Sequence, residues 1–304
     1  MKRVIITGGT GLIGRALTNE LLRNGYAVVG LSRKPQDATN VPAGARSVVW
    51  DGRSAQGWGE LADGAYAIVN LAGATIARPP WTEAYKRSIA QSRIDAGHAV
   101  VEAVKAAAQK PGVVLQASAV GIYGVRNGKA ISETAPAGDD FLAQVCRQWE
   151  ASTLEVEALG VRRVVIRTGL VLSARGGVLP LISLPFRMFV GGPVGSGQQF
   201  WPWIHIDDEV QAIRFLMEKA DARGVFNLSA PTPLTNAEFS RTLGHVLHRP
   251  AFLTAPAIAM KLALGEMADL LLLGGQRAMP SHLQTLGYTF RYAEAEGALR
   301  ALFA

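Results

Sequence analysis

Over the first 170 residues, short apolar runs alternate with longer stretches in which apolar positions recur at helical spacing. The short β-branched runs predict strands at 4–6, 27–31, 47–50, 67–71, 113–117 and 163–167. The stretches between them predict helices at 12–24, 83–109 and 140–159. Apolar strands that alternate with helices are typical of a parallel sheet that is covered on both faces and joined by right-handed crossovers. The pattern therefore predicts an α/β fold, a doubly wound parallel sheet of Rossmann type.

Beyond residue 174 the pattern changes. Residues 176–202 are rich in Gly, Pro and aromatic residues and predict an ordered loop region over a site. The following residues predict a strand at 225–228 and helices at 207–220, 235–247, 256–273 and 294–302. Thr235 and Glu238 have the spacing of a capping box. The 256–273 segment carries charged residues, so it predicts a buried amphipathic helix and not a membrane span.

These patterns divide the chain into two expected domains. The first, at 1–175, contains the Rossmann-type sheet, and the strand near 225 is expected to return to this sheet. The second, at 176–304, is a smaller, mostly helical C-terminal lobe that is expected to hold the substrate.

Composition narrows the class of protein. The 304 residues are 49% apolar and carry a net charge of +7, from 31 Lys and Arg against 24 Asp and Glu. The basic residues are scattered, which favours a solvated surface with phosphate contacts over specific nucleic-acid binding. Cys146 is the single cysteine, so no disulfide can form within the chain, and the five His have no metal-ligand spacing. The chain starts without a signal-peptide pattern, and we expect a cytoplasmic protein without a metal or a membrane segment.

The strongest motif is the glycine-rich segment between the first strand and the first helix. Gly8 permits a tight turn, Gly11 lets the backbone approach a pyrophosphate, and Gly14 lets the helix pack closely on the strand. The helix N-terminus then presents free N–H groups and a positive dipole to phosphate. The predicted phosphate contacts comprise Thr7, Gly8, Gly9, Thr10, Gly11, Leu12, Ile13 and Gly14.

The ends of the next strands indicate which dinucleotide binds. An NAD enzyme places a carboxylate after the second strand, to accept from the ribose 2′-OH. This chain has Ser32, Arg33 and Lys34 there, which suit a 2′-phosphate and favour NADP(H) over NAD(H). Asp51 follows the third strand and is expected to meet the adenine amino group, although it could equally be a turn residue. Leu71, Ala72 and Gly73 end the fourth strand, where small residues let the backbone run past the ribose.

The combination of motifs resembles the extended short-chain dehydrogenase/reductases. The residues that carry the resemblance are the 7–14 loop, Asn70 to Gly73, Ser118 to Gly124, Arg167 to Gly169 and Trp203 to Asp208. A closer resemblance is to the atypical, epimerase-like subfamily of NAD(P)-dependent epimerase/dehydratase proteins with its C-terminal module. Its features recur as Cys146, Trp149 and Glu150, as Gly191 to Pro193 with Gly195 to Gly197, and as Gly265 to Ala268. The resemblance implies that Arg167 belongs to the cofactor site and that the chain is a monomer or a homodimer.

The chain departs from the broad family at the catalytic pair. Catalytic members carry Tyr-x-x-x-Lys on the helix after the fifth strand, where the Tyr is the base and the Lys lowers its pKa. Here that helix has neither residue, and Leu142 with Cys146, or Cys146 with Glu150, occupy the two positions. Replacement candidates for the acid–base work are Ser118, Tyr123, Cys146 and Glu150. Tyr123 could also be structural, Cys146 a buried small hydrophobe, and Glu150 a structural partner.

Two further sets of residues invite a role. His205 precedes two aspartates at a predicted helix start and is interpreted as a structural hydrogen-bonding residue more readily than as a base. The segment 185–203 could form a substrate wall that suits a sugar or another polar planar ligand, and its tryptophans could equally be core residues. The candidate wall residues are Arg187, Gln198, Gln199, Trp201 and Trp203.

Three functions follow from these observations. The first is an NADP(H)-dependent oxidoreductase or epimerase-like enzyme with an atypical site. The second is a non-catalytic NADP(H)-binding regulator; some relatives in the resembled subfamily have a link to cell division. The third, nucleic-acid binding, depends on net charge alone.

Overall fold

A computed structural model describes residues 1–33, 40–126 and 128–304. Lys34, one of the predicted phosphate contacts, lies outside the described residues.

The described residues form a main sheet of seven parallel strands in the order β3-β2-β1-β4-β5-β7-β11. The predicted α/β class is confirmed. The strand near 225 pairs in parallel with the sixth predicted strand and so joins the sheet from beyond residue 175. The strands are β1 (Arg3–Thr7), β2 (Ala27–Ser32), β3 (Arg46–Val49), β4 (Ala67–Asn70), β5 (Val113–Ala119), β7 (Arg162–Thr168) and β11 (Gly224–Leu228).

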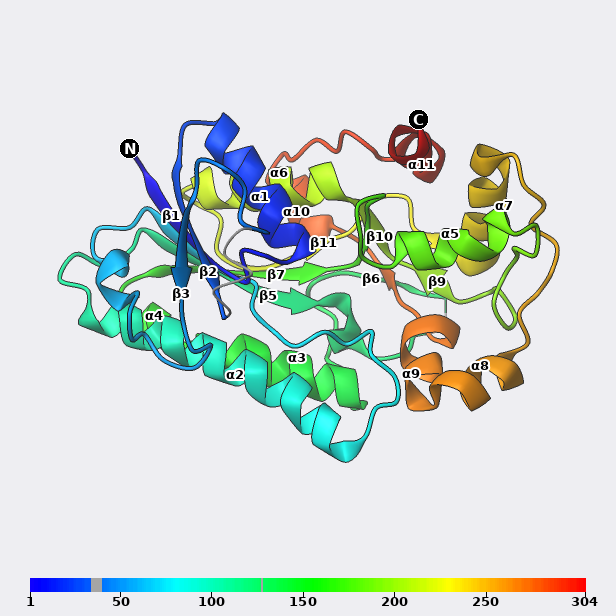
Figure 1. The fold of residues 1–304 in the computed structure, drawn as a ribbon, viewed down its shortest axis with the longest axis horizontal. Coiled ribbons are helices and arrows are strands. Elements are labelled where there is room, and N and C mark those ends of the chain that lie inside the picture. Colours follow the sequence, from blue (N-terminus) through cyan, green and yellow to red (C-terminus); the bar gives the residue numbers. More distant parts are fainter. Residues whose placement is uncertain (34–39, 127) are drawn as a thin grey trace.

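Helices cover both faces of this sheet (Figure 1). On one face lie α1 (Leu12–Arg23) and α6 (Ile206–Glu218), and on the other α2 (Glu83–Ala106) and α3 (Phe141–Ala151). Fully buried side chains line both interfaces, Leu17 and Ile213 on the first and Ala96 and Val100 on the second. The predicted helix 140–159 is in fact two helices, since α4 (Glu155–Ala158) starts anew after a turn.

The carboxyl ends of the strands face the second half of the chain, which adds short elements there (Figure 1). The region predicted as loop contains a helix, α5 (Leu179–Arg187). The capping box at Thr235 and Glu238 is present at the start of α7 (Asn236–Leu247). Small sheets pair β8 (Leu170–Leu172) with β10 (Trp203–His205), β9 (Phe200–Trp201) with β12 (Leu234–Thr235), and β6 (Ala130–Ile131) with β13 (Arg277–Ala278). Short helices α10 (Ser281–Thr285) and α11 (Ala295–Phe303) complete the chain.

The prediction of one buried helix at 256–273 is wrong. Gly265 has a φ of +59°, which ends α8 (Ala257–Leu264) and turns the chain into α9 (Glu266–Ala268) and a wide turn at 269–273. No residue of α8 is buried, and Ile258 and Leu262 are 73% and 84% exposed. The described part of the chain holds no helix that is long and apolar enough to cross a membrane.

Candidate active site

A buried chain of hydrogen bonds fixes the ends of three neighbouring strands. The Thr7 hydroxyl donates to Asn70 Oδ1 at 2.6 Å, and Asn70 Nδ2 donates to Gln116 Oε1 at 2.8 Å. The Thr7 oxygen also accepts from the backbone N–H groups of Leu71 and Ala72. Thr7 therefore lies behind the site and holds the loop after β4 in place.

The glycine-rich loop leaves no room for side chains on two of its glycines. A Cβ on Gly14 would lie 2.3 Å from the carbonyl oxygen of Gly8, and Gly8 itself has a φ of +70°. Gly11 caps α1 without a side-chain hydrogen bond, and no acidic residue lies in the first turn. The start of α1 thus presents uncapped N–H groups, the arrangement that binds phosphate at helix N-termini. Gly9 packs against Gly30 of β2 and not into the open space.

These strand ends border an open groove of about 850 Å³. Nine predicted cofactor residues come together in its lining: Gly8, Thr10, Gly11, Ser32, Arg33, Asp51, Leu71, Ala72 and Gly73. Leu12, Ile13 and Gly14 line a connecting cavity of about 330 Å³ that shares Gly8, Gly11 and Leu71 with the groove. We call these two spaces the cofactor groove and the connecting cavity.

One end of the cofactor groove is formed by β2 and β3. The side chain of Arg33 passes over Gly52, where a Cβ would lie 3.1 Å from Arg33 Cδ, so Gly52 makes room for it. Asp51 accepts hydrogen bonds from the backbone N–H groups of Arg53 and Ser54 and from the Ser54 hydroxyl. The N–H of Arg53 contributes most to holding the pKa of Asp51 below its usual range. Asp51 is therefore both a turn residue and part of the groove lining.

Arg167, expected in the cofactor site, is placed elsewhere. Its guanidinium donates to both carboxylate oxygens of Glu150, at 2.8 and 2.9 Å, and to the Tyr123 hydroxyl at 3.0 Å. It is 8% exposed and does not line the groove or the cavities around it. Arg167 thus joins β7 to α3, and the Glu150 carboxylate offsets the cost of burying its charge.

The four catalytic candidates meet around this ion pair, but only some of them reach open space. Ser118 donates to Glu150 Oε1 at 2.7 Å and lines the connecting cavity. Tyr123 is fully buried, and its hydroxyl donates to Asn227 at 2.7 Å. Burial raises the pKa of Tyr123. The geometry therefore makes Tyr123 a structural residue and leaves Ser118 with Glu150 as the pair nearest the site.

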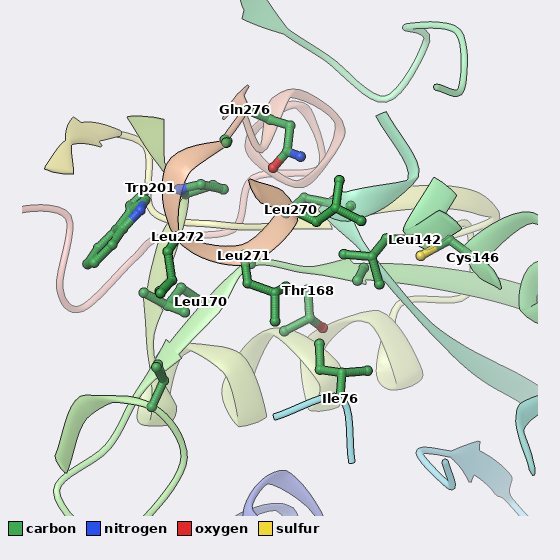
Figure 2. A pocket seen from close by; sticks show the side chains of 18 of the residues that line it. Ile76, Leu142, Cys146, Thr168, Leu170, Trp201, Leu270, Leu271, Leu272 and Gln276 are labelled. Atoms are coloured by element: carbon green, nitrogen blue, oxygen red, sulfur yellow. The ribbon is translucent and has the colours of Figure 1, made fainter. Parts of the chain in front are cut away.

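Beyond the connecting cavity lies a pocket of about 200 Å³ with a mainly apolar wall, which we call the apolar pocket. It shares Trp149, Thr168, Gly169, Leu170 and Val178 with the connecting cavity, so groove, cavity and pocket adjoin one another in this order. Figure 2 shows Leu142 and Cys146 of α3 on one side and the Leu270–Leu272 turn on another. Ile76, from the loop after β4, closes it from a third side (Figure 2).

The structure does not bring the residues of the predicted substrate wall together. Arg187 and Gln198 are exposed, and Arg187 stacks on Phe303. Gln199 donates to the carbonyl oxygens of Val194 and Leu272, so it joins the turn at 269–273 to the segment around Val194. Trp203 is a fully buried core residue. Trp201 packs on Phe239, with ring centroids 5.6 Å apart, and also lines the apolar pocket.

His205 is structural, as the first of its two interpretations had it. Its Nδ1 accepts from the backbone N–H of Asp207 at 3.0 Å, which caps the start of α6. The ring is 3% exposed and stacks on Tyr292. Burial lowers the pKa of His205.

The sequence resembles known proteins over its whole length. The NAD dependent epimerase/dehydratase family matches residues 4–229, and a domain of unknown function, DUF1731, matches residues 255–302. The chain belongs to the epimerase/dehydratase family.

Two named members of this family match the chain over its whole length. The epimerase family protein YfhF of Bacillus subtilis is 38% identical over 302 residues, which cover 99% of this chain and 98% of the relative. The epimerase family protein SA0724 of Staphylococcus aureus is 36% identical over 306 residues, with 99% of both chains covered.

Solved structures agree with this assignment. Human epimerase family protein SDR39U1 (isoform 2), crystallised with NADPH, is 34% identical with a TM-score of 0.87, over 99% of this chain and 98% of that one. UDP-glucuronic acid 4-epimerase from Bacillus cereus has a TM-score of 0.79, over 99% of this chain and 98% of that one. At 18% identity it shows a shared fold only.

Within this family, the chain departs at the positions of the Tyr and the Lys. Leu142 and Cys146, one of the two pairs that could occupy these positions, both line the apolar pocket. Burial raises the pKa of the Cys146 thiol to about 11. A thiol of this kind is not a thiolate near neutral pH and is not a suitable base or nucleophile.

Sequence reasoning missed the contribution of α2 to the site. Arg87, Gln91 and Asp95 recur every four residues and line the cofactor groove, and Arg93 lines the apolar pocket. The recurrence of these polar residues every four positions, on one face of the helix, was the available signal. The Leu270–Leu272 turn gave no such signal, because a run of leucines is equally typical of a core helix.

Proposed function

We propose that this protein is an NADP(H)-dependent oxidoreductase of the extended short-chain type, with an atypical catalytic site. The observation that carries the proposal is that the cofactor groove, the connecting cavity and the apolar pocket adjoin one another through shared lining residues. An enzyme that moves a hydride needs its cofactor and its substrate at adjoining positions, and these spaces provide both.

The chain's own residues fit NADP(H) at each part of the groove. The start of α1 holds the pyrophosphate on backbone N–H groups, which the Gly8–Gly14 contact keeps close to β1. Ser32 and Arg33 would hold the 2′-phosphate, and Gly52 gives the Arg33 side chain its place. Asp51 lines the same groove and would meet the adenine. The NADPH in the 34% identical human protein supports this choice of cofactor.

When bound, NADPH supplies a hydride with its two electrons to a carbonyl carbon. The carbonyl oxygen must then gain one proton, which comes in the end from water. Ser118 and Glu150 form the acid–base couple nearest the connecting cavity, and the Ser118 hydroxyl donates a hydrogen bond of 2.7 Å to Glu150. In the direction of alcohol oxidation, the Ser118 oxygen accepts the substrate's O–H proton while its own proton moves to Glu150.

A titration with NADPH and with NADH tests the cofactor assignment, with Arg33→Ala as the variant and Arg46→Ala as the control. Arg46 is an exposed cation at the other end of β3, away from the groove. A hydrogen bond to a charged group contributes about 1.5–3 kcal/mol, so we expect Arg33→Ala to weaken NADPH about ten- to a hundredfold and to leave NADH unchanged. Equal binding of both cofactors by the native protein would contradict the proposal.

The enzymatic part has its own readout. Oxidation of NADPH in the presence of aldehydes, ketones and nucleotide sugars is expected for at least one substrate class. Tight NADPH binding without turnover of any of them would instead support the non-catalytic regulator.

A further inference from the structure

The apolar pocket offers few polar groups to a ligand. Among the described residues that line it, Arg93 is the one charged side chain. The two uncharged polar side chains, Thr168 and Gln276, already donate to Glu209 and to the carbonyl oxygen of Gly124. A nucleotide sugar carries a diphosphate and many hydroxyls, and such groups cost free energy when they are buried without partners. The pocket therefore suits a ligand with a mostly apolar body.

Arg93 reaches the pocket from α2, a helix that carries no part of the family's usual catalytic pair. Both of its hydrogen bonds come from Nη1, to the carbonyl oxygens of Ala74 at 3.1 Å and Ile89 at 2.9 Å. Its guanidinium lies 4.7 Å over the ring of Trp149. Gly73 makes room for it, since a Cβ there would lie 2.9 Å from Arg93 Cζ.

These contacts hold the guanidinium in place and leave donors unused. No carboxylate among the described residues forms an ion pair with Arg93, and none of them accepts from its Nε or Nη2. Burial lowers the pKa of this guanidinium, although an arginine stays charged in proteins. A half-buried cation without an anionic partner is costly, and such groups are concentrated at ligand sites.

Trp149 adds a second unused donor at the same place. Its indole Nε1 is buried and has no hydrogen-bond partner among the described residues, and the side chain lines both the apolar pocket and the connecting cavity. Buried indole N–H groups normally find an acceptor. Arg93 and Trp149 are stacked on each other, so both side chains with unused donors lie at the same wall of the apolar pocket.

We propose that the apolar pocket binds a small carbonyl compound with a mostly apolar body, whose oxygen accepts hydrogen bonds from Arg93. The proposal rests on the oxidoreductase function above and names its substrate class, in place of the sugar-like or polar ligand that the sequence favoured. The cavity of about 200 Å³ has room for one or two rings or a short alkyl chain. Arg93 is the group that orients the carbonyl, and it stays charged throughout.

The test uses 6-propionyl-2-(dimethylamino)naphthalene, a fluorescent ketone whose emission moves to shorter wavelength in apolar surroundings. Added to the full chain saturated with NADPH, it is expected to give a saturable shift that UDP-glucuronic acid does not reverse. No saturable shift, or displacement by the UDP-sugar, would overturn the proposal.

Variants then separate the role of Arg93 from folding and from cofactor binding. Arg93→Gln is expected to weaken the ketone about ten- to a hundredfold at unchanged NADPH affinity, and Arg93→Lys to restore part of the loss. Arg147→Gln is the control, since Arg147 is an exposed cation on α3 that does not line the pocket. Leu271→Asp, on the turn over the pocket, is expected to weaken the ketone as well. Equal loss of ketone and NADPH binding in Arg93→Gln would make Arg93 a cofactor ligand and the proposal wrong.

Reduction of the ketone is followed separately, by loss of NADPH absorbance. Binding that depends on Arg93 without reduction of any carbonyl would support this inference and contradict the oxidoreductase function. Reduction of nucleotide sugars but of no apolar carbonyl would do the reverse.

Discussion

The cofactor groove and the apolar pocket are built in different ways, although both adjoin the connecting cavity. The groove has room for a dinucleotide, at about 850 Å³, and its walls are glycines, backbone and polar side chains at the ends of neighbouring strands. The pocket, at about 200 Å³, is walled mainly by apolar side chains from α3, α5, β9 and the 270–272 turn. The first depends on local backbone geometry, the second on how distant segments pack.

This difference teaches where the family's chemistry has changed. The phosphate loop keeps its close backbone contacts, whereas neither of the two pairs that could occupy the catalytic positions contains a Tyr or a Lys. The one charged side chain among the described residues of the pocket comes from α2, and Ser118, paired with Glu150, lines the connecting cavity. Binding of a cofactor and recognition of a substrate are thus carried by separate sets of residues, and substitutions should affect them separately.

The largest difference between the two regions is expected when a side chain is added in the phosphate loop, which should affect the cofactor groove and not the apolar pocket. In Gly14→Ala the new Cβ would meet the Gly8 carbonyl oxygen at 2.3 Å, so the loop must move. We expect NADPH binding to be lost, with a Kd at least a hundredfold higher, while ketone binding in the apolar pocket persists. Isothermal titration with NADPH measures it.

The control for this variant is Gly297→Ala. Gly297 lies in α11, and a Cβ there meets no atom within 4 Å. Because Ala is the better helix former, we expect a gain in the free energy of unfolding of about 0.5–1 kcal/mol and unchanged NADPH binding. Similar damage from both alanines would mean that Gly14→Ala acts through general misfolding and not through the loop.

A second substitution tests the role of Ser118 at the connecting cavity, which lies between the two regions. Ser118→Ala removes the hydroxyl that donates to Glu150 but leaves the Glu150–Arg167 pair in place. General acid–base catalysis contributes about 10²–10⁴-fold to rates, so we expect kcat to fall about a hundredfold at unchanged NADPH affinity. Steady-state kinetics with a reducible carbonyl measure the effect. A kcat close to that of the native protein would exclude Ser118 from the proton transfer.

The pH dependence of stability is expected to distinguish a carboxyl group of the groove, Asp51, from one below the pocket, Glu209. Backbone donors lower the pKa of Asp51 in the groove, whereas burial raises the pKa of Glu209, which accepts from Thr168 below the pocket, to about 8. A raised carboxyl pKa means that the folded state binds the proton more tightly than the unfolded state. Its contribution is fully present below the ordinary value of 4.5 and is lost as pH rises toward about 8.

Glu209→Gln should therefore remove this loss. Gln keeps an oxygen that accepts from Thr168, and it carries no charge at any pH. We expect the Tm of the native protein to fall relative to that of the variant as pH rises from 5 to 8, as followed by thermal unfolding. Parallel Tm curves over this range would show that Glu209 is ionised in the folded protein.

The smallest effect is expected at the cysteine. The Cys146 thiol is buried, and its pKa is raised to about 11, so it takes no part in proton transfer. Cys146→Ala should leave the pH profile of kcat unchanged and lower the free energy of unfolding by about 1 kcal/mol, since it removes one buried sulfur atom. A pH profile that lost one of its limbs would instead identify the thiol as an acid–base group.

Sequence alone determined the doubly wound sheet, the phosphate loop, and the absence of the usual Tyr and Lys. These features could be predicted because strand and helix periods and glycine spacing act over a few neighbouring residues, within which backbone sterics decide the conformation. The same reasoning brought Ser32, Arg33 and Asp51 to one groove, because parallel strands place their carboxyl ends at one edge.

Only the tertiary structure decided which side chains reach the open space. Arg167 and Tyr123 belong to family motifs but are buried. The Arg167 guanidinium pairs with the Glu150 carboxylate and also donates to the Tyr123 hydroxyl. Arg93 and the 270–272 turn meet in one pocket although about 180 residues separate them along the chain. Such contacts depend on packing between elements that are far apart in sequence, so the local periodicity of the sequence does not predict them.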